Sequence, residues 1–109
     1  YEMERRRLLR FLAESKANHP VVLTGDIHSN WAVNIKADFA EEKSAVLGEE
    51  FVGTSITSGG DGLDLPAAED AFKRDNPHLA FFLAKRGYVV CGLDAKQWRT
   101  DYRVVPYVT

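Results

Sequence analysis

The order of apolar and polar residues predicts an amphipathic helix at the start of the chain. Within residues 2–16, Leu8, Phe11 and Leu12 follow the i, i+3, i+4 spacing that places side chains on one face of a helix. Pro20 ends this helix, because proline cannot continue the hydrogen-bond ladder and also restricts the residue before it. The opening segment therefore carries one apolar stripe.

Two different apolar patterns predict strands after this helix. Residues 21–24 form a short continuous apolar run, which is typical of a strand buried on both faces. Residues 31–38 alternate instead, and a period of two predicts a half-buried strand. The apolar face of this second strand consists of Trp31, Val33, Ile35 and Ala37.

The middle of the chain continues with extended and turn-forming segments. Residues 44–47 and 50–57 predict one long strand or two short strands around Gly48. Residues 58–62 contain three glycines and predict a loop. Residues 66–74 predict a short helix, since a proline is tolerated in the first helical turn.

The last third of the chain is dominated by strand patterns. The apolar residues 79–83 fit either a strand or a helix, whereas 87–93 and 98–108 predict two strands joined by a short turn. Cys91 lies in the first of these two strands, which predicts a buried and unreactive thiol. The whole pattern indicates a mixed α/β (α+β) fold that is rich in strands.

Composition and charge limit the classes of function. The 109 residues include 14 basic and 16 acidic side chains, a formal net charge of -2, with a single cysteine. This balance excludes a broad basic surface for nucleic acid and a polybasic attraction to anionic membranes, and one cysteine excludes an internal disulfide. The run Arg5-Arg6-Arg7 lies among glutamates and predicts a solvated helix face. No apolar run approaches the roughly 20 residues that span a bilayer.

The most informative polar segment follows directly after the apolar run 21–24. There, Gly25 allows a sharp exit from the strand, and the next residues include Asp26 and His28. A carboxylate oxygen and an imidazole nitrogen in one turn can face one metal centre, although two ligands alone do not fill a coordination shell. The alternative is that Asp26 caps a turn and His28 is an ordinary polar loop residue.

Other candidate groups carry weaker signals. The loop 58–62 lacks the lysine and the spacing of a phosphate-binding P-loop, which favours a flexible loop at the rim of the fold. His78 follows an Asn-Pro pair and is either a turn residue or a further ligand. Arg86 could pair with a phosphoryl oxygen, but a surface arginine is the favoured interpretation.

Several segments together resemble a known family. Leu-Thr-Gly-Asp-Ile-His-Ser-Asn-Trp at 23–31 and Glu-Phe-Val-Gly-Thr-Ser-Ile-Thr-Ser at 50–58 are followed in order by Asn76-Pro-His78 and Arg86-Gly-Tyr88. This combination resembles the C-terminal part of PhoD-like alkaline phosphatases, a branch of the calcineurin-like metallophosphoesterases. The resemblance extends over nearly the whole chain.

The resemblance implies a fold, a reaction and a set of site residues. The fold would be the C-terminal half of a four-layer α/β/β/α sandwich, and the reaction hydrolysis of phosphate monoesters, and often diesters, by a metal-activated water. Asp26 and His28 match the family's metal-binding motif, with iron and calcium as the implied metals. Asn30 and His78 are candidates for positioning water or substrate. An extracytoplasmic location, periplasmic or secreted, is implied as well.

The sequence departs from the family pattern in what accompanies these motifs. The superfamily carries further aspartate and Asn-His ligands in an N-terminal half, and residues 1–109 contain no second cluster to replace them. We therefore expect the chain to be the C-terminal portion of such a domain, with the N-terminal half as its structural partner and little turnover when isolated. The alternative is a non-catalytic binding or interaction module of the same fold with an incomplete metal site.

Overall fold

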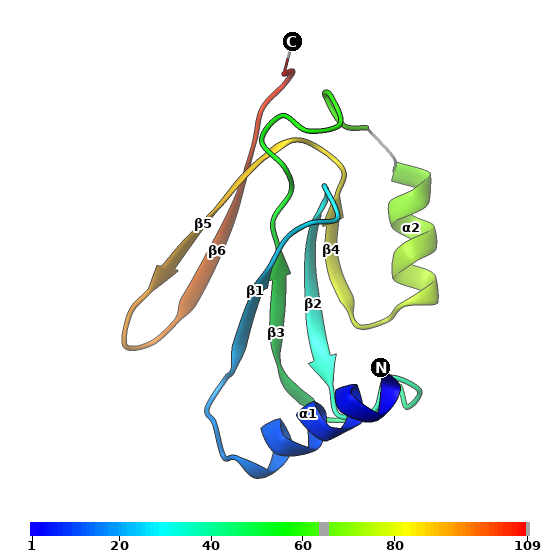
Figure 1. The fold of residues 1–109 in the computed structure, drawn as a ribbon, viewed down its shortest axis with the longest axis vertical. Coiled ribbons are helices and arrows are strands. Elements are labelled where there is room, and N and C mark those ends of the chain that lie inside the picture. The colour runs from blue at the N-terminus through cyan, green and yellow to red at the C-terminus, as the bar shows by residue number, and fades with distance from the viewer. Residues whose placement is uncertain (64–65, 109) are drawn as a thin grey trace.

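The computed structural model describes residues 1–63 and 66–108. The expected domain, residues 1–109, also includes Asp64, Leu65 and Thr109, which lie outside the described residues. Four strands form a central sheet in the order β1-β3-β2-β4, and the last two strands form a separate hairpin (Figure 1). The elements along the chain are α1 (Glu2–Glu14), β1 (Val21–Thr24), β2 (Asn30–Lys36), β3 (Val46–Val52), α2 (Pro66–Asp75), β4 (Leu79–Leu83), β5 (Gly87–Leu93) and β6 (Trp98–Val104). The predicted mixed α/β class is confirmed.

The strand directions bring three loops to one end of the sheet. β1 pairs with β3 in parallel, so the carboxyl ends of both strands point the same way. β2 is antiparallel to both of its neighbours, and Asn30 at its start pairs with Leu83 at the end of β4. The segments after β1, β3 and β4 therefore meet at the same edge of the fold.

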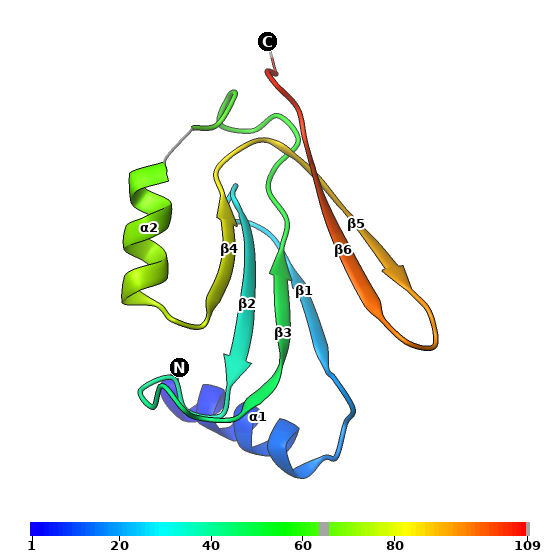
Figure 2. The same cartoon turned by 180° about the vertical axis from the view of Figure 1, so that it is seen from behind.

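The central sheet is covered on both faces. On one face, Phe72 of α2 packs against Trp31 and Phe82, with ring centroids 5.5 Å and 5.1 Å away. On the other face, the hairpin β5–β6 places Trp98 over Phe51 and Tyr102 over Phe81, at centroid distances of 6.3 Å and 4.8 Å. Figure 2 shows the resulting three layers of helix, sheet and hairpin.

Helix α1 lies across the end of the sheet opposite to the three loops (Figures 1 and 2). It contacts β3, and its single buried side chain in the described part of the chain is Leu9, at 8% exposure. Leu8 and Phe11 are 56% and 63% exposed, so the prediction that they form the packed stripe is wrong. A helix that crosses the ends of strands packs through a narrow line of side chains rather than through a full apolar face.

The predicted strand positions are mostly confirmed, but two burial predictions are wrong. β1 has the predicted bounds, yet it is one of the two outer strands of the four-stranded sheet, and Leu23 is 56% exposed rather than buried on both faces. Cys91 is exposed as well, because it lies in the separate hairpin. In both cases the apolar run reports strand propensity correctly, while burial depends on the neighbours that the fold supplies.

The other extended segments differ from prediction in their limits. β2 begins one residue earlier than expected, and the two segments around Gly48 form the single strand β3, which ends at Val52. Gly48 is required by a close approach, since a Cβ atom there would lie 2.2 Å from the carbonyl oxygen of Pro20. Residues 79–83 form a strand. Neither helix of the described chain is long and apolar enough to cross a membrane.

Candidate functional site

Asp26 and His28 lie in the turn that follows β1, at the end of the sheet where the three loops meet. Ile27 N–H donates to the Gly25 carbonyl oxygen at 3.0 Å, and the residue between them, Asp26, has a φ of 75°. This is the geometry of a γ-turn with positive φ, the rarer and more strained form. Both Asp26 and His28 are exposed to solvent.

The turn holds two non-glycine residues in the left-handed region of backbone conformation. His28 has a φ of 59°, close to that of Asp26. Such conformations cost of order 1 kcal/mol or more for residues with a Cβ atom, and they persist only where neighbouring contacts hold them. The turn that carries this carboxylate and this imidazole is therefore strained at both residues.

Arg86 connects this turn to the glycine-rich loop. Its guanidinium donates through Nη1 to the His28 carbonyl oxygen, through Nε to the Gly60 carbonyl oxygen at 2.9 Å, and through Nη2 to the Gly59 carbonyl oxygen at 3.2 Å. Arg86 is only 8% exposed, so the favoured interpretation as a surface arginine is wrong. Sequence alone misses this role, because only the strand register brings the residue after β4 under both loops.

Asn30 is the most deeply buried side chain near the site, at 1% exposure. Its Nδ2 donates to the carbonyl oxygens of Leu83 and Lys85 at 3.1 Å and 3.0 Å. Its Oδ1 accepts from the Thr54 N–H at 3.3 Å. Both amide protons are therefore used by the backbone, and the contacts favour a role in joining three loops over the predicted role in positioning water or substrate, which stays untested.

The segment after β3 contributes a buried hydroxyl to this end of the sheet. Thr54 Oγ1 is buried and has no hydrogen-bond partner among the described residues. Buried polar atoms are nearly always hydrogen-bonded, so this hydroxyl is an exception among the described residues. Thr54 thus adds a polar group beside Asn30, close to the loops that carry Asp26 and His28.

His78 lies at the opposite end of the sheet from Asp26 and His28. It precedes β4, whose five residues separate it from the site by about 15 Å. Its ring stands edge-on to Phe39 at a centroid distance of 4.9 Å. Partial burial, followed by the positive charge of Lys36, lowers the pKa of His78. The structure therefore does not bring this predicted site residue together with the other candidates.

The donors at the site fit a metal ion only as part of a larger set. Asp26 offers a hard carboxylate oxygen and His28 a borderline imidazole nitrogen, a combination that suits several divalent and trivalent metals. Within residues 1–63 and 66–108, no group of three or more histidine, cysteine, aspartate or glutamate side chains gathers around a common point. The described chain thus offers two candidate donors at this turn, and two donors alone do not fill a coordination shell.

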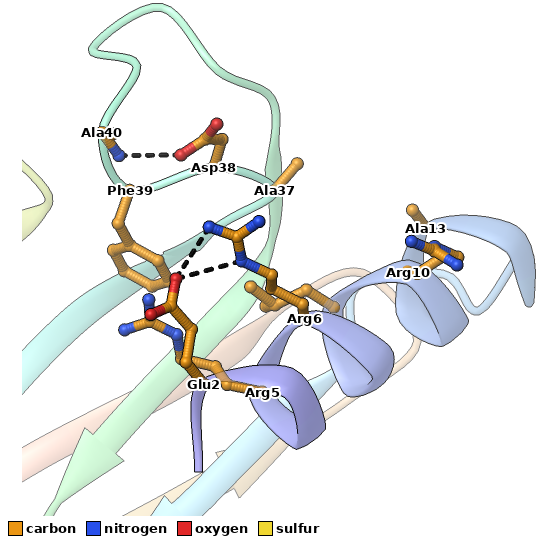
Figure 3. A pocket seen from close by; sticks show the side chains of 10 residues that line it. Glu2, Arg5, Arg6, Arg10, Ala13, Ala37, Asp38, Phe39 and Ala40 are labelled. Atoms are coloured by element: carbon orange, nitrogen blue, oxygen red, sulfur yellow. Dashed lines mark hydrogen bonds and ion pairs between the residues drawn. The ribbon is translucent and has the colours of Figure 1, made fainter.

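A separate hollow of about 340 Å³ lies between α1 and residues 37–40, at the far end of β2 from the candidate site (Figure 3). Its basic side chains are already engaged in part, since Arg6 pairs with Glu2 at 2.7 Å and Arg5 lies over the ring of Phe39. These groups form a solvated helix face, as predicted from the sequence. The hollow contributes nothing to the Asp26–His28 site.

The chain matches known proteins along nearly its whole length. The model of the PhoD-like phosphatase family matches residues 1–102, which confirms the resemblance seen in the motifs. Alkaline phosphatase D of Bacillus subtilis (strain 168) is 49% identical over 109 residues, which are 100% of this chain and 19% of that protein. A solved structure described as "Structure of PhoD" has a TM-score of 0.91 and 48% identity, covering 99% of this chain and 21% of that chain. The chain thus spans about a fifth of the length of these relatives.

Proposed function

Because this chain belongs to the PhoD-like phosphatase family, we propose that it forms part of an enzyme that hydrolyses phosphate esters. The observation that carries the proposal is the strained turn after β1, in which both Asp26 and His28 are exposed to solvent. Strain of this kind gathers at functional sites, where the surrounding structure holds it in place. The proposed substrates are phosphate monoesters and diesters.

In this proposal, Asp26 and His28 hold a metal centre. A bound metal centre would lower the pKa of an attacking water and stabilise the charge on the phosphoryl oxygens. The Asp26 carboxylate contributes charge and a hard oxygen, and the His28 imidazole must be neutral to contribute a ring nitrogen. The other ring nitrogen then needs a hydrogen-bond acceptor that fixes the orientation of the ring.

Three finer points belong to the same proposal. The donor set suits iron together with calcium, because carboxylate oxygen binds hard cations and imidazole binds iron. The three layers of helix, sheet and hairpin form part of a four-layer α/β/β/α domain, whose remaining strands and ligands come from parts of the longer enzyme outside this chain. The enzyme acts outside the cytoplasm, an assignment that rests on family resemblance alone.

A non-catalytic binding module of the same fold has less support. Such a module would need neither the carboxylate nor the imidazole, and both are present in the turn after β1. These two donors and the 49% identity to alkaline phosphatase D favour the enzyme.

Substitution at the two proposed ligands in the full-length enzyme tests this function. We expect Asp26→Asn and His28→Ala each to lower turnover of 4-nitrophenyl phosphate by more than about 100-fold and to lower bound metal, because each change removes a donor. Asp26→Gly should have the same effect while leaving the unfolding free energy unchanged or up to about 1 kcal/mol higher, since glycine relieves the positive φ. Retention of wild-type turnover and metal content would remove the proposal.

The chain offers a matched control for each ligand. His19 is also exposed and also has a positive φ, of 51°, but it lies between α1 and β1 at the other end of the sheet. Asp70 is exposed on α2. We expect His19→Ala and Asp70→Asn to keep wild-type turnover and metal content, which would show that the effects at Asp26 and His28 are specific to their position.

A further inference from the structure

The side chain of Arg86 is a buried cation that, among the described residues, is hydrogen-bonded only to carbonyl oxygens. It is 8% exposed, and no aspartate or glutamate of the described ranges pairs with it. Burial of a charge is costly unless hydrogen bonds replace water. The carbonyl oxygens of His28, Gly59 and Gly60 provide those bonds. The buried guanidinium therefore fixes the turn of His28 and the Gly59–Gly60 loop relative to each other.

The guanidinium is suited to this task by its shape. Its N–H donors form a rigid planar fork, so three acceptors that bind it at once are held in a fixed relation to one another. Lysine carries the same charge on a flexible stem and cannot reproduce this geometry. The contacts of Arg86 thus depend on the fork as well as on the charge.

The fork brings the glycine-rich loop against the imidazole of His28. Gly59 has a φ of 81°, and a Cβ atom there would lie 2.9 Å from Arg86 Nη2 and 3.8 Å from His28 Nδ1. The loop can approach this closely only because glycine has no side chain. Arg86, Gly59 and His28 are therefore packed together, with the left-handed backbone of His28 held through its own carbonyl group.

The backbone around Arg86 is itself anchored to the rest of the fold. The Arg86 carbonyl oxygen accepts from Val105 N–H at 3.0 Å, and Gly87 N–H donates to the Ser55 carbonyl oxygen at 3.1 Å. Asn30 binds the carbonyl oxygen of the preceding residue, Lys85. The backbone of Arg86 is thus fixed to the sheet and the hairpin. Its guanidinium reaches from there to the turn of His28 and to the Gly59–Gly60 loop, and it holds the backbone of His28 in place.

We propose that Arg86 is a positioning residue, which sets the orientation of His28 toward the metal centre by binding its carbonyl oxygen and closing the Gly59–Gly60 loop over it. This inference rests on the proposed function of His28. Arg86 touches no reacting atom in this role. It acts through the imidazole, so its loss should weaken metal binding and slow turnover rather than weaken substrate binding.

The test compares Arg86→Met and Arg86→Lys with wild type in the full-length enzyme. Mn²⁺ is titrated into metal-free protein, and kcat and KM are measured with 4-nitrophenyl phosphate. We expect Arg86→Met to weaken Mn²⁺ binding by about 10- to 100-fold, which is typical of residues that orient metal ligands, and to lower kcat with little change in KM. Arg86→Lys should recover little of either loss, because lysine lacks the fork. Arg7→Met, at an exposed arginine of α1, should match wild type.

Other outcomes would overturn the proposal. Wild-type Mn²⁺ affinity in folded Arg86→Met would reduce Arg86 to a purely structural role, and full recovery in Arg86→Lys would show that the charge alone matters. If Arg86→Met does not fold, the same titration of Arg86→Lys decides between weakened and wild-type affinity. His28→Ala separates this proposal from the one on which it rests: if His28→Ala abolishes metal binding and Arg86→Met does not, only the role of Arg86 fails.

Discussion

Asp26 and Asn30, four residues apart, show two opposite uses of a polar side chain at one end of the sheet. Asp26 leaves its carboxylate in solvent on a strained turn, and within residues 1–63 and 66–108 no hydrogen bond or ion pair of that carboxylate offsets the strain. Asn30 is buried and binds three backbone groups from two segments, two at the end of β4 and one after β3. The first arrangement costs stability and fits the proposed role of Asp26 as a metal ligand, and the second stabilises the backbone around the site.

The role of Asn30 is testable by truncation. We expect Asn30→Ala to lower the unfolding free energy by roughly 2–3 kcal/mol, because it leaves the Leu83 and Lys85 carbonyl groups and the Thr54 N–H without their partner in a buried place. Urea unfolding measures this loss. Asn34→Ala on the same strand is the matched control, with an expected change within about 0.5 kcal/mol. Equal effects of the two substitutions would contradict the bracing role of Asn30.

At the scale of elements, α1 shows how an amphipathic pattern can be correct while its packed face is misjudged. The helix forms where the pattern predicts it, over Glu2–Glu14. It meets the sheet through Leu9, however, and leaves Leu8 and Phe11 in solvent. A hydrophobic stripe identifies the side of a helix that can be buried, but the crossing position decides which of its residues is.

Two truncations in α1 test whether Leu9 or Leu8 is the residue that packs against the sheet. Leu9→Ala should lower the unfolding free energy by about 2–3 kcal/mol, since it removes a buried side chain and leaves a cavity. Leu8→Ala, one residue away and exposed, should change it by less than about 0.5 kcal/mol. Thermal or urea unfolding of both variants measures the difference. A larger effect at Leu8 would show that the apolar stripe predicted from the sequence, which includes Leu8, is the packed one.

The hairpin β5–β6 is attached to the sheet in part through Tyr102. Its hydroxyl group donates to the Trp31 carbonyl oxygen, and its ring packs on Phe81. Burial, with a smaller contribution from Cys91, raises the pKa of Tyr102 to about 12. The folded state thus favours the neutral phenol, so the stability that this group contributes is complete below pH 10 and is lost as the pH rises toward 12.

This sign leads to a prediction at alkaline pH. At neutral pH, Tyr102→Phe should be less stable than wild type by about 1 kcal/mol, because the hydrogen bond is lost. The difference should shrink as the pH rises from about 10 to about 12, because the tyrosine of unfolded wild type then ionises at its ordinary pKa of 10.0 while the folded phenol stays neutral, which stabilises the unfolded state of wild type alone. Unfolding by urea at several pH values measures it. Tyr88→Phe, at an exposed position of β5, should show no such trend.

At the scale of the whole molecule, the described chain leaves much apolar surface uncovered. β1 has a neighbour on one side only, and exposed apolar side chains occur on α1, on β1 and on the hairpin. A hollow of about 680 Å³ lies between the sheet and the hairpin tip, lined in part by Phe51, Leu93 and Trp98. An open strand edge with apolar side chains is a ready template for pairing with another chain.

We therefore predict that the isolated chain self-associates. Sedimentation velocity over a range of concentrations should show an average mass that rises with concentration. Leu23→Lys, which places a charge on the exposed edge strand β1, should reduce this rise. Leu63→Lys, at an exposed loop position, serves as the control and should leave it unchanged. A single monomeric species at all concentrations would contradict the prediction.

The sequence by itself determined the positions of most elements and the identity of the two proposed ligands. Periodicity and proline placement act locally, so they located α1, β1, α2 and the hairpin strands close to their observed bounds. The short spacing between Asp26 and His28 placed both in one turn whatever the rest of the fold does. Family motifs in order along the chain then indicated a phosphatase, which the family match confirms at the level of the family.

Only the tertiary structure decided which residues are buried and which candidates meet. Burial of Leu23, Cys91 and Arg86 depends on neighbours distant in sequence, and all three differ from expectation. The antiparallel pairing of β4 with β2 sends His78 to one end of the sheet and Arg86 to the other, so the first leaves the site and the second joins it. The physical reason is that strand register and layer packing are sums of long-range contacts, which no local pattern of residues records.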